Sequence, residues 1–517
     1  MKTIRSVEGE DWDVVVVGGG IGGLAAAAYV ARAGKRTLLL EARDRFSGRA
    51  ENVALGEGIS APVAAEAFYP LDRKLIRDLQ LHKFGLQFAS RAMPVTALRP
   101  DGRHLILPPE LHRAREAIAA EGAADAAAYR KFRRDHFALA QRLRSLWVPR
   151  GDSAQWRNPL GSLTAIAREL ALSGALQEQL DMAAHSSADA YVRNWFESDT
   201  LVTALTFDTV LDGVGPDEPC SALLLVWRAA QEYAGVQGAV GQVEGGPAVF
   251  AEAVVEAARE AGAVLRNGVQ VSAIEVEDGR VSGLRLDDDG RVGTNIVISS
   301  LCARQTFEDL LLPDVRPFGS LRHIDRPDRF SAAKGLFALK GLPPFAGLSE
   351  RELSGRLIIS EHSDAAARSK LAALSGLLPT DLVMEVTVPS VADPTLSAKG
   401  MHVLSANIPF LPSYPQGGWE ANRHVLEKQI LSALEGYAPG LSDRVVNGLI
   451  ITPDEFRARY GRDYSHMNFY ERLVRSYGEG VRTPIKGLYL CGLDAEPVTA
   501  ITGRAGRVAA LLALAEE

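Results

Sequence analysis

The apolar pattern near the N-terminus predicts a strand, a turn, a helix and a second strand in close succession. Val14 to Val17 is a run of four apolar β-branched residues, which is typical of a strand buried on both faces. Glycines follow it, and Leu24 to Ala33 is rich in helix-forming residues, with Gly34 placed to end the helix. Thr37 to Leu40 is a second apolar run. This order predicts one unit of a parallel α/β sheet.

The same region also allows a membrane-span interpretation. Val14 to Ala31 contains no charged residue, and this stretch is long enough to suggest a transmembrane helix. However, five glycines are clustered inside it, and such a cluster suits a turn better than a helix that faces lipid. We therefore favour the strand and turn.

Further along the chain, both helical and strand patterns recur. Helices are expected in residues 69–85, through most of residues 110–210, and from about Pro247 to Ala261. Strands are expected in residues 86–108 with a turn at Asp101-Gly102, in residues 264–290 with turns at Asp278-Gly279 and Asp289-Gly290, and in residues 295–300. Residues 310–475 mix strands, Pro-rich loops and helices, and residues 485–517 again predict a strand, a glycine-containing loop and a helix.

The glycines after the first strand fit a dinucleotide-binding turn. Gly18, Gly20 and Gly23 match G-x-G-x-x-G, which allows a tight turn, close approach of a pyrophosphate, and packing of the helix on the strand. Glu41 follows the second strand, at the spacing from Gly23 where a carboxylate can accept hydrogen bonds from a ribose. A carboxylate there would repel a 2′-phosphate, so NADP is disfavoured.

Composition narrows the remaining function classes. The chain has 517 residues, which predicts two to four domains, and a net charge of −7, which makes nucleic acid an unexpected partner. Three scattered cysteines favour neither a disulfide framework nor a Cys-rich metal site, and no other metal motif is recognisable. The first residues lack an apolar leader, so a cytoplasmic location is expected. His185, near Ser186 and Asp189, is better explained as a loop or helix end than as part of a catalytic triad.

Four segments together resemble one family of flavoproteins. They are "VVVVGGGIGGLAAAAYVARAGKRTLLLEARDRFSGRA", "YVRNWFESDTLVTALTFDTVLDGVGPDEP", "GAVGQVEGGPAVFAEAVVEAAREAGA" and "TPIKGLYLCG". In this order they resemble the phytoene desaturase and amine oxidase superfamily, and most closely its phytoene-dehydrogenase-like branch, over nearly the whole chain.

The resemblance implies an α/β fold with FAD as the cofactor. The expected architecture is a discontinuous, GR2-type Rossmann-like FAD-binding domain made of residues 1–85, 240–310 and 480–517. A mixed α+β substrate-binding domain with a helical part is expected in residues 86–239 and 311–479. Cofactor contacts are expected at Gly18, Gly20, Gly22, Gly23, Glu41, Ala42, Arg43, Gly48, Arg49, Val271, Gly492, Leu493, Asp494, Thr499 and Ala500.

The implied activity is dehydrogenation or desaturation of an apolar or partly apolar small molecule by hydride transfer to the flavin. Trp195, Phe196, Phe207 and Trp227 are candidates for the substrate cavity, although ordinary core positions explain each one better. Because only one nucleotide fingerprint is present, NADH and NADPH are expected to be poor substrates. The electron acceptor stays unidentified, and a homodimer and transient membrane contact stay open.

The loop after "LYLCG" leaves one alternative open. Val498, Thr499 and Ala500 stand where the family group often has glycines, which keeps a flavin-binding isomerase or a non-redox flavoprotein subunit as the alternative function. Glu496 stands where the group often has histidine and is the candidate catalytic residue, either as a proton acceptor or as an orienting group.

Overall fold

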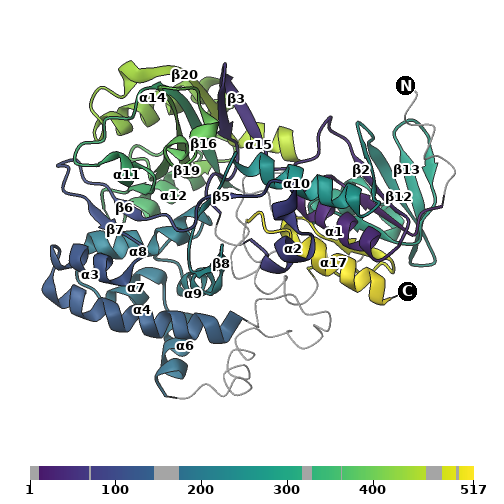
Figure 1. The fold of residues 1–517 in the computed structure, drawn as a ribbon, viewed down its shortest axis with the longest axis horizontal. Helices are drawn as coiled ribbons and strands as arrows, with labels where there is room; N and C mark the ends of the chain where they lie inside the picture. The colour runs from purple at the N-terminus through teal and green to yellow at the C-terminus, as the bar shows by residue number, and fades with distance from the viewer. Residues whose placement is uncertain are drawn as a thin grey trace.

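Two β-sheets organise the part of the chain that the computed structural model describes, and they lie side by side with helices around each (Figure 1). The described residues are 11–68, 71–144, 174–316, 329–362, 364–461, 480–495 and 500–516. The cofactor-type motifs fall on the smaller sheet. The boundaries expected for the two domains stay a prediction.

The smaller sheet is parallel and collects strands that are far apart in the sequence. Its order is β11 (Val264–Asn267), β2 (Thr37–Glu41), β1 (Val14–Val17), β15 (Val297–Ser299) and β21 (Leu488–Leu490). On one face, Val14 and Val16 pack against helices α1 (Ile21–Arg32), α10 (Pro247–Glu260) and α17 (Arg504–Ala515). On the other face, Val15 and Val17 pack against the antiparallel strands β12 (Val271–Glu277), β13 (Arg280–Leu286) and β14 (Arg291–Val292). Burial on both faces explains why these strands are uninterrupted apolar runs.

The first helix begins earlier than the sequence predicts. Helix α1 starts at Ile21 rather than at Leu24, so Gly22 and Gly23 lie in its first turn. This first turn packs closely on the loop before it, because a Cβ atom at Gly23 would clash with the carbonyl oxygen of Gly18. The membrane-span interpretation is wrong, since this stretch divides into a strand and a helix. Among the described helices, none is both long and apolar enough to cross a bilayer.

The prediction of one continuous helix in residues 69–85 is also wrong. The segment divides into α2 (Arg73–Asp78) and a short 3₁₀ helix, η2 (Leu81–Phe84). Gln80 lies between them in the left-handed region, with φ of 52°, so the helix cannot continue through it. Tyr69 and Pro70 lie outside the described residues.

The larger sheet has seven strands. Its order is β20 (Val445–Ile451), β16 (Phe330–Lys340), β19 (Met401–Pro412), β18 (Met384–Thr387), β17 (Arg356–Ile359), β6 (Val95–Ala97) and β7 (Leu105–Leu107). All neighbouring strands are antiparallel except β17 and β6, which are parallel. Helices α12 (Ala365–Leu374) and α14 (Gly418–Glu435) pack against this sheet.

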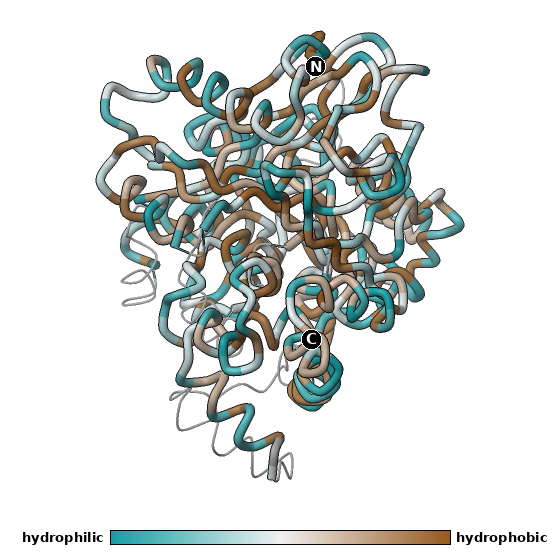
Figure 2. Tube along the Cα trace, turned by 90° about the vertical axis from the view of Figure 1, so that its left-hand side faces the viewer, coloured by the Kyte–Doolittle hydropathy of each residue, from teal (hydrophilic) through white to brown (hydrophobic). Residues whose placement is uncertain are grey.

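The expected helical region forms a separate bundle beside the larger sheet (Figure 1). Its helices are α3 (Leu111–Ala119), α4 (Ala123–Leu143), α6 (Ala175–His185), α7 (Ala188–Arg193), α8 (Asp199–Leu211) and α9 (Ala222–Ala230). Figure 2 shows hydrophobic segments crossing the interior and hydrophilic segments on many of the outer turns. Apolar burial therefore holds both sheets and the bundle together.

Candidate functional site

A large cleft opens at the carboxyl ends of the parallel strands. It has a volume of about 530 Å³, and its walls include Gly18 after β1, Glu41 at the end of β2, Ser300 after β15, and Gly492 after β21. In open parallel sheets, ligands bind at this edge, where loops from neighbouring strands separate. The cleft therefore lies where the sequence motif predicts a dinucleotide.

The glycine turn and Glu41 form one wall of this cleft. Glu41 Oε2 accepts a hydrogen bond from the Gly19 backbone N–H at 2.6 Å, and its Oε1 accepts one from the Arg43 backbone N–H at 2.8 Å. Both bonds fix the carboxylate at the end of β2. A Cβ atom at Gly48 would lie 2.9 Å from the Gly20 Cα, so the loop that carries Gly48 passes directly beside the glycine turn.

A cluster of arginines around one tyrosine forms a second wall, and we name it the arginine–tyrosine cluster (Arg43, Arg49, Glu51, Arg459 and Tyr460). Tyr460 ends helix α15 (Pro453–Tyr460), and its hydroxyl donates to Glu51 Oε1 at 2.5 Å. Arg43 Nη2 donates to Glu51 Oε2 at 2.7 Å. The guanidinium carbons of Arg43 and Arg49 each lie 5.6 Å from the centre of the Tyr460 ring.

The charge of this cluster suits a phosphate-bearing ligand. It holds three guanidinium groups and one carboxylate, and Arg43, Arg49 and Arg459 line the cleft. Burial and the Glu51 carboxylate raise the pKa of Tyr460, which keeps its hydroxyl a donor at physiological pH. Since the Gly48 loop places the cluster beside the glycine turn, its positive charge lies where a pyrophosphate would bind.

A second, smaller cavity of about 90 Å³ joins the large cleft. Arg49, Leu493, Ala500 and Ile501 line both cavities and mark the junction. Apolar side chains, such as those of Ala64, Phe68 and Leu211, form part of its wall, and charged and amide side chains form the rest. The cavity is therefore partly apolar and partly ionic.

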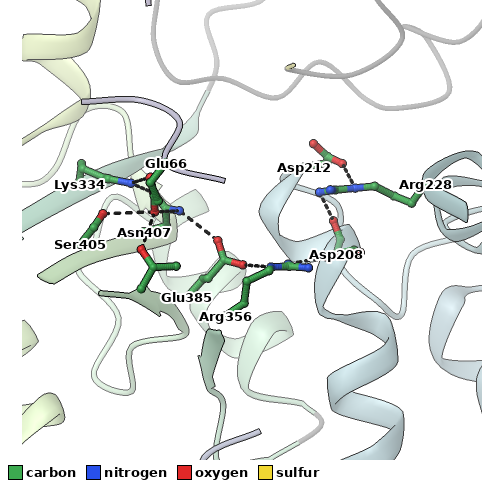
Figure 3. A network of polar contacts seen from close by, with 10 residues as sticks. Glu66, Asp208, Asp212, Arg228, Lys334, Arg356, Glu385, Ser405 and Asn407 are labelled. Carbon is green, nitrogen blue, oxygen red and sulfur yellow. Dashed lines mark hydrogen bonds and ion pairs between the residues drawn. The ribbon is translucent and has the colours of Figure 1, made fainter. Parts of the chain in front are cut away.

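The ionic part comes from neighbouring strands of the larger sheet. In the strand registers, Lys334 of β16 and Glu385 of β18 both stand opposite Asn407 of β19. In β17, Ile358 pairs with Glu385. Arg356 is two residues from Ile358 in the same strand, so the Arg356 side chain lies on the same face of the sheet as that of Glu385. The pairing of the strands thus places the four side chains in one row (Figure 3).

Hydrogen bonds connect this row into one chain, which we name the buried ionic chain (Glu66, Lys334, Asn407, Glu385, Arg356 and Asp208). Lys334 Nζ donates to Glu66 and, at 2.7 Å, to Asn407 Oδ1. Asn407 Nδ2 donates to Glu66 and to Glu385, each at 3.2 Å. Arg356 Nε donates to Glu385 at 2.5 Å, and its Nη2 donates to Asp208 at 2.6 Å (Figure 3).

Two acids of this chain, Glu66 and Asp208, have lowered pKa values because cations lie beside them. The Lys334 ammonium lowers the pKa of Glu66 against the opposing effect of burial. Arg356 and Arg228 lower the pKa of Asp208 to about 2, although burial alone would raise it. Asp208 and Glu385 in turn raise the pKa of the Arg356 guanidinium. Glu66 and Asp208 are therefore ionised at physiological pH.

The structure brings most predicted cofactor residues into the large cleft. The predicted residues that line it are Gly18, Gly20, Gly22, Glu41, Ala42, Arg43, Gly48, Arg49, Val271, Gly492, Leu493 and Ala500. Gly23 instead packs against Gly18, and the Asp494 carboxylate accepts a hydrogen bond from the Ala303 backbone N–H at 2.7 Å. Glu496 and Thr499 lie outside the described residues, as does Val498, so the isomerase alternative stays open. Contact of these residues with a cofactor stays a prediction.

The four aromatic candidates for the substrate cavity line neither of these two cavities, which agrees with the core positions that explain each of them better. Phe196, Phe207 and Trp227 are core residues, and Trp195 packs against the core of the helical bundle. His185 is the last residue of α6, and its Nδ1 lies 2.7 Å from the Asp181 carbonyl oxygen.

Sequence reasoning predicted Arg43 and Arg49 as cofactor contacts, but it missed the other members of the arginine–tyrosine cluster and the whole buried ionic chain. The sequence did contain a signal for the buried ionic chain. Lys334 and Glu385 are single charged residues inside the apolar runs "SAAKGLFAL" and "LVMEVTV". A lone charge in a buried strand needs a partner, and here each finds one across the sheet. Tyr460 had no comparable local signal.

Comparisons with known proteins agree with this geometry. The family of NAD(P)-binding Rossmann-like domains matches residues 16–79. Pyridine nucleotide-disulfide oxidoreductase domain-containing protein 2 of Rattus norvegicus is 26% identical, over 97% of this chain and 93% of the rat protein. Phytoene desaturase (neurosporene-forming) of Cereibacter sphaeroides is 24% identical, over 97% of this chain and 94% of that protein.

Over nearly its whole length the chain is thus similar to proteins of the phytoene desaturase and amine oxidase superfamily. Its fold is also that of putrescine oxidase, whose structure with bound putrescine superimposes with a TM-score of 0.63 at 16% identity, over 98% of this chain and 99% of the oxidase. This similarity confirms the predicted class, an FAD-dependent oxidoreductase that dehydrogenates its substrate.

Proposed function

We propose that the protein dehydrogenates a small, partly apolar molecule that binds in the small cavity, with FAD held in the large cleft. The observation that carries the proposal is the junction of the two cavities at Arg49, Leu493, Ala500 and Ile501. A substrate in the small cavity would there meet the end of a ligand that extends along the cleft. Such contact is what direct hydride transfer requires.

The residues of the cleft fit FAD along its length. The glycine turn and the start of α1 offer backbone N–H groups to the pyrophosphate, and the arginine–tyrosine cluster offers positive charge beside them. Glu41 lies at the end of β2, where it can accept hydrogen bonds from the adenosine ribose. When bound, FAD supplies a ring that accepts a hydride.

The remaining parts of the proposal concern the electron acceptor, the cellular location and the assembly of the protein. We propose an electron acceptor that is not NAD(P), because the chain has a single nucleotide fingerprint. A cytoplasmic location, a homodimer and transient membrane contact stay predictions from the sequence.

Cofactor content and flavin reduction test this proposal. The purified protein is expected to be yellow and to release FAD on denaturation. Substrate added without oxygen should bleach the flavin, and an acceptor should restore its colour, whereas NADH and NADPH should reduce it poorly. A colourless protein that cannot be reconstituted with FAD would contradict the proposal, and rapid stoichiometric reduction by NADPH would contradict the choice of acceptor.

A matched pair of variants tests the site itself. Glu41→Ala removes charge-assisted hydrogen bonds worth about 1.5–3 kcal/mol each, so the Kd for FAD should rise by about tenfold or more. Glu57→Ala removes an exposed carboxylate between β3 (Asn52–Gly56) and β4 (Ile59–Pro62) and should leave the Kd unchanged. Equal affinity of both variants for FAD would remove Glu41 from the site.

A further inference from the structure

We propose that Phe410 is a positioning residue for the small cavity. A β-bulge in β19 holds it in a strained backbone conformation, and its ring fixes helix α8, which forms one wall of the cavity. Phe410 thereby sets the shape of the molecule that the cavity admits. The inference rests on the proposed function for the identity of the small cavity as the substrate site.

The backbone of Phe410 is unusual for a buried residue of a strand. Among the described residues other than glycine, six have a positive φ, and Phe410, with φ of 56°, is the one that lies inside a strand. Its side chain is fully buried. In the left-handed region the Cβ atom lies too close to the carbonyl oxygen, so a bulky residue keeps this conformation only where the surrounding structure imposes it.

A β-bulge between β16 and β19 accompanies this conformation. The register shifts by one residue between two pairs of the ladder, Ser331 with Leu411 and Ala333 with Ile408. Ala332 of β16 therefore stands opposite both Pro409 and Phe410 of β19. Such bulges re-aim side chains and are frequent beside active sites. Ala332 and Pro409 both line the small cavity, so the bulge lies in the cavity wall.

The extra residue directs the Phe410 ring to the opposite face of the sheet from Ile408. In a regular strand, residues 408 and 410 would point to the same face. Instead, Ile408 and Leu411 share the apolar cluster under helix α14. Phe410 belongs to a different cluster, which it shares with Phe207 and Val210 of α8. Since α8 contacts β19, the bulge supplies an aromatic side chain to this contact.

Helix α8 in turn forms one wall of the small cavity. Its last residue, Leu211, and the following residue, Asp212, both line the cavity. About one turn earlier, the Asp208 carboxylate accepts a hydrogen bond from Arg356 of the larger sheet at 2.6 Å (Figure 3). A shift of α8 relative to β19 would move all three α8-side residues. The packing of Phe410 on α8 therefore fixes this wall.

A lysine on the far side of the ring completes the contact. The Lys370 ammonium of α12 lies 5.5 Å from the centre of the Phe410 ring and 4.7 Å from the centre of the Phe330 ring. The same ammonium donates to Glu218, in the segment between α8 and α9. Lys370 thus joins the ring to the segment that follows α8. Confinement from several sides is the condition under which a strained backbone persists.

Glycine and alanine variants test whether the fold imposes the strained backbone. In a regular strand alanine is more stable than glycine, because glycine loses more backbone freedom on folding. At residue 410 the order should reverse, and Phe410→Gly should melt about 1–2 °C above Phe410→Ala, since glycine adopts a positive φ without strain. Phe337, a buried residue in the regular part of β16, is the control, and Phe337→Ala should melt above Phe337→Gly. The usual order at both positions would overturn the inference.

Two isomeric alcohols, 1-butanol and tert-butanol, test the effect on the cavity of the full, FAD-loaded protein. Calorimetry and the flavin difference spectrum follow each titration. The wild-type protein should bind 1-butanol at least about fivefold more tightly, because a cavity of about 90 Å³ between fixed walls has little room for a branched molecule. Phe410→Ala frees α8 and should reduce this ratio to about twofold or less.

The Kd for FAD separates positioning from a general structural role. Phe410→Ala should leave this Kd unchanged, because the residue does not line the large cleft, whereas a general loss of structure would raise it. Phe410→Leu keeps an apolar side chain and should restore most of the alcohol ratio, and Phe337→Ala should keep the wild-type ratio. If Phe410→Ala does not fold, Lys370→Met should lower the ratio, since it removes the link to the segment after α8.

A wild-type ratio near one, a ratio unchanged in Phe410→Ala, or an equal loss in Phe337→Ala would overturn the inference. Its failure is distinguishable from failure of the proposed function. A protein that never takes up FAD, but whose calorimetric ratio depends on Phe410, keeps the positioning role and loses the redox role. A protein whose flavin is reduced by a substrate, but whose ratio is independent of Phe410, keeps the redox role and loses the positioning role.

Discussion

At the residue scale, Tyr460 contacts two arginines that line the large cleft. Its hydroxyl donates to Glu51, and its ring lies under Arg43 and Arg49, which line the cleft. Tyr460→Phe should raise the Kd for FAD a few-fold because it removes one hydrogen bond. Tyr460→Ala should raise the Kd for FAD by about tenfold or more, because this variant also loses the aromatic ring that contacts both arginines. Fluorescence titration of the apoprotein with FAD measures both.

The chain offers a close control for this experiment. Tyr414 is also covered by an arginine, with the Arg457 guanidinium carbon 4.5 Å from its ring centre, but it is exposed and does not line the cleft. Tyr414→Ala should therefore leave the Kd for FAD unchanged. If Tyr460→Ala binds FAD as tightly as Tyr414→Ala does, the arginine–tyrosine cluster has no role in cofactor binding.

His136 predicts how acid affects stability. Its ring stacks on Phe132 with centroids 5.2 Å apart, and burial in helix α4 lowers its pKa to about 4. The unfolded chain takes up this proton below about pH 6.5, whereas the folded chain does so only near pH 4. Its contribution to stability is therefore complete above pH 6.5 and falls as the pH drops toward 4. At pH 5.0 the loss should be about 2 kcal/mol.

Urea unfolding at pH 7.5 and 5.0 measures this loss. His136→Gln removes the titrating group, so the difference in unfolding free energy between the two pH values should shrink by about 2 kcal/mol. The exposed His424 is the control, and His424→Gln should keep the wild-type difference. An unchanged difference in His136→Gln would mean that acid acts through other groups.

Local residue signals predicted residues of the large cleft better than residues of the small cavity. Gly18, Gly20 and Glu41 lie within one short segment, so their spacing alone indicates a common site. Lys334, Asn407 and Glu385 meet only through the pairing of three strands, and no local pattern encodes that register. Glu496, the one predicted catalytic residue, lies outside the described part of the chain.

At the element scale, helices α1 and α17 pack closely enough to require glycine at their contact. A Cβ atom at Gly506 of α17 would clash with the Gly22 carbonyl oxygen in α1. Gly506→Ala should push the helices apart, destabilise the protein by about 1–3 kcal/mol, and weaken FAD binding because the start of α1 moves. Thermal unfolding and FAD titration measure the two effects.

Gly436 provides a comparison for this substitution. It caps α14 with a right-handed helical backbone, and a Cβ atom there would meet its nearest neighbour at 3.4 Å. Gly436→Ala should therefore leave stability unchanged or raise it slightly. A Gly506→Ala protein as stable as Gly436→Ala would show that the two helices can separate without cost.

The strands of the smaller sheet were the elements most readily predicted. Val14 to Val17 and Thr37 to Leu40 are buried on both faces, and this burial leaves a continuous apolar run in the sequence. The helix expected in residues 69–85 failed because apolar spacing does not reveal a residue such as Gln80 in the left-handed region. In the larger sheet, β6 pairs with β17 although the two strands are far apart in the sequence, and such pairing is set by tertiary packing.

At the scale of the whole molecule, the large cleft joins parts of the chain that no single segment holds together. Its walls come from residues 17–50, from residues 269–310, from the end of α15, and from residues 491–493 and 500–505. Bound FAD would contact all of these at once. Cofactor binding should therefore be coupled to the stability of the entire fold, since a ligand that binds only the folded state stabilises it.

This coupling predicts a cofactor-dependent melting temperature. FAD at about 100 times its Kd should add about 2.7 kcal/mol to the free energy of unfolding, and the increase should grow with the logarithm of FAD concentration. Riboflavin should raise the melting temperature far less at the same concentration, because the proposed binding mode pairs Glu41 and Arg43 of the cleft with the adenosine and phosphate part of FAD, which riboflavin lacks. Circular dichroism melts of the apoprotein with each compound measure the difference.

Equal stabilisation by riboflavin and FAD would mean that the glycine turn, Glu41 and the arginine–tyrosine cluster contribute nothing to binding. A larger effect of FAD that disappears in Glu41→Ala, but persists in Glu57→Ala, would place the adenosine part at the end of β2.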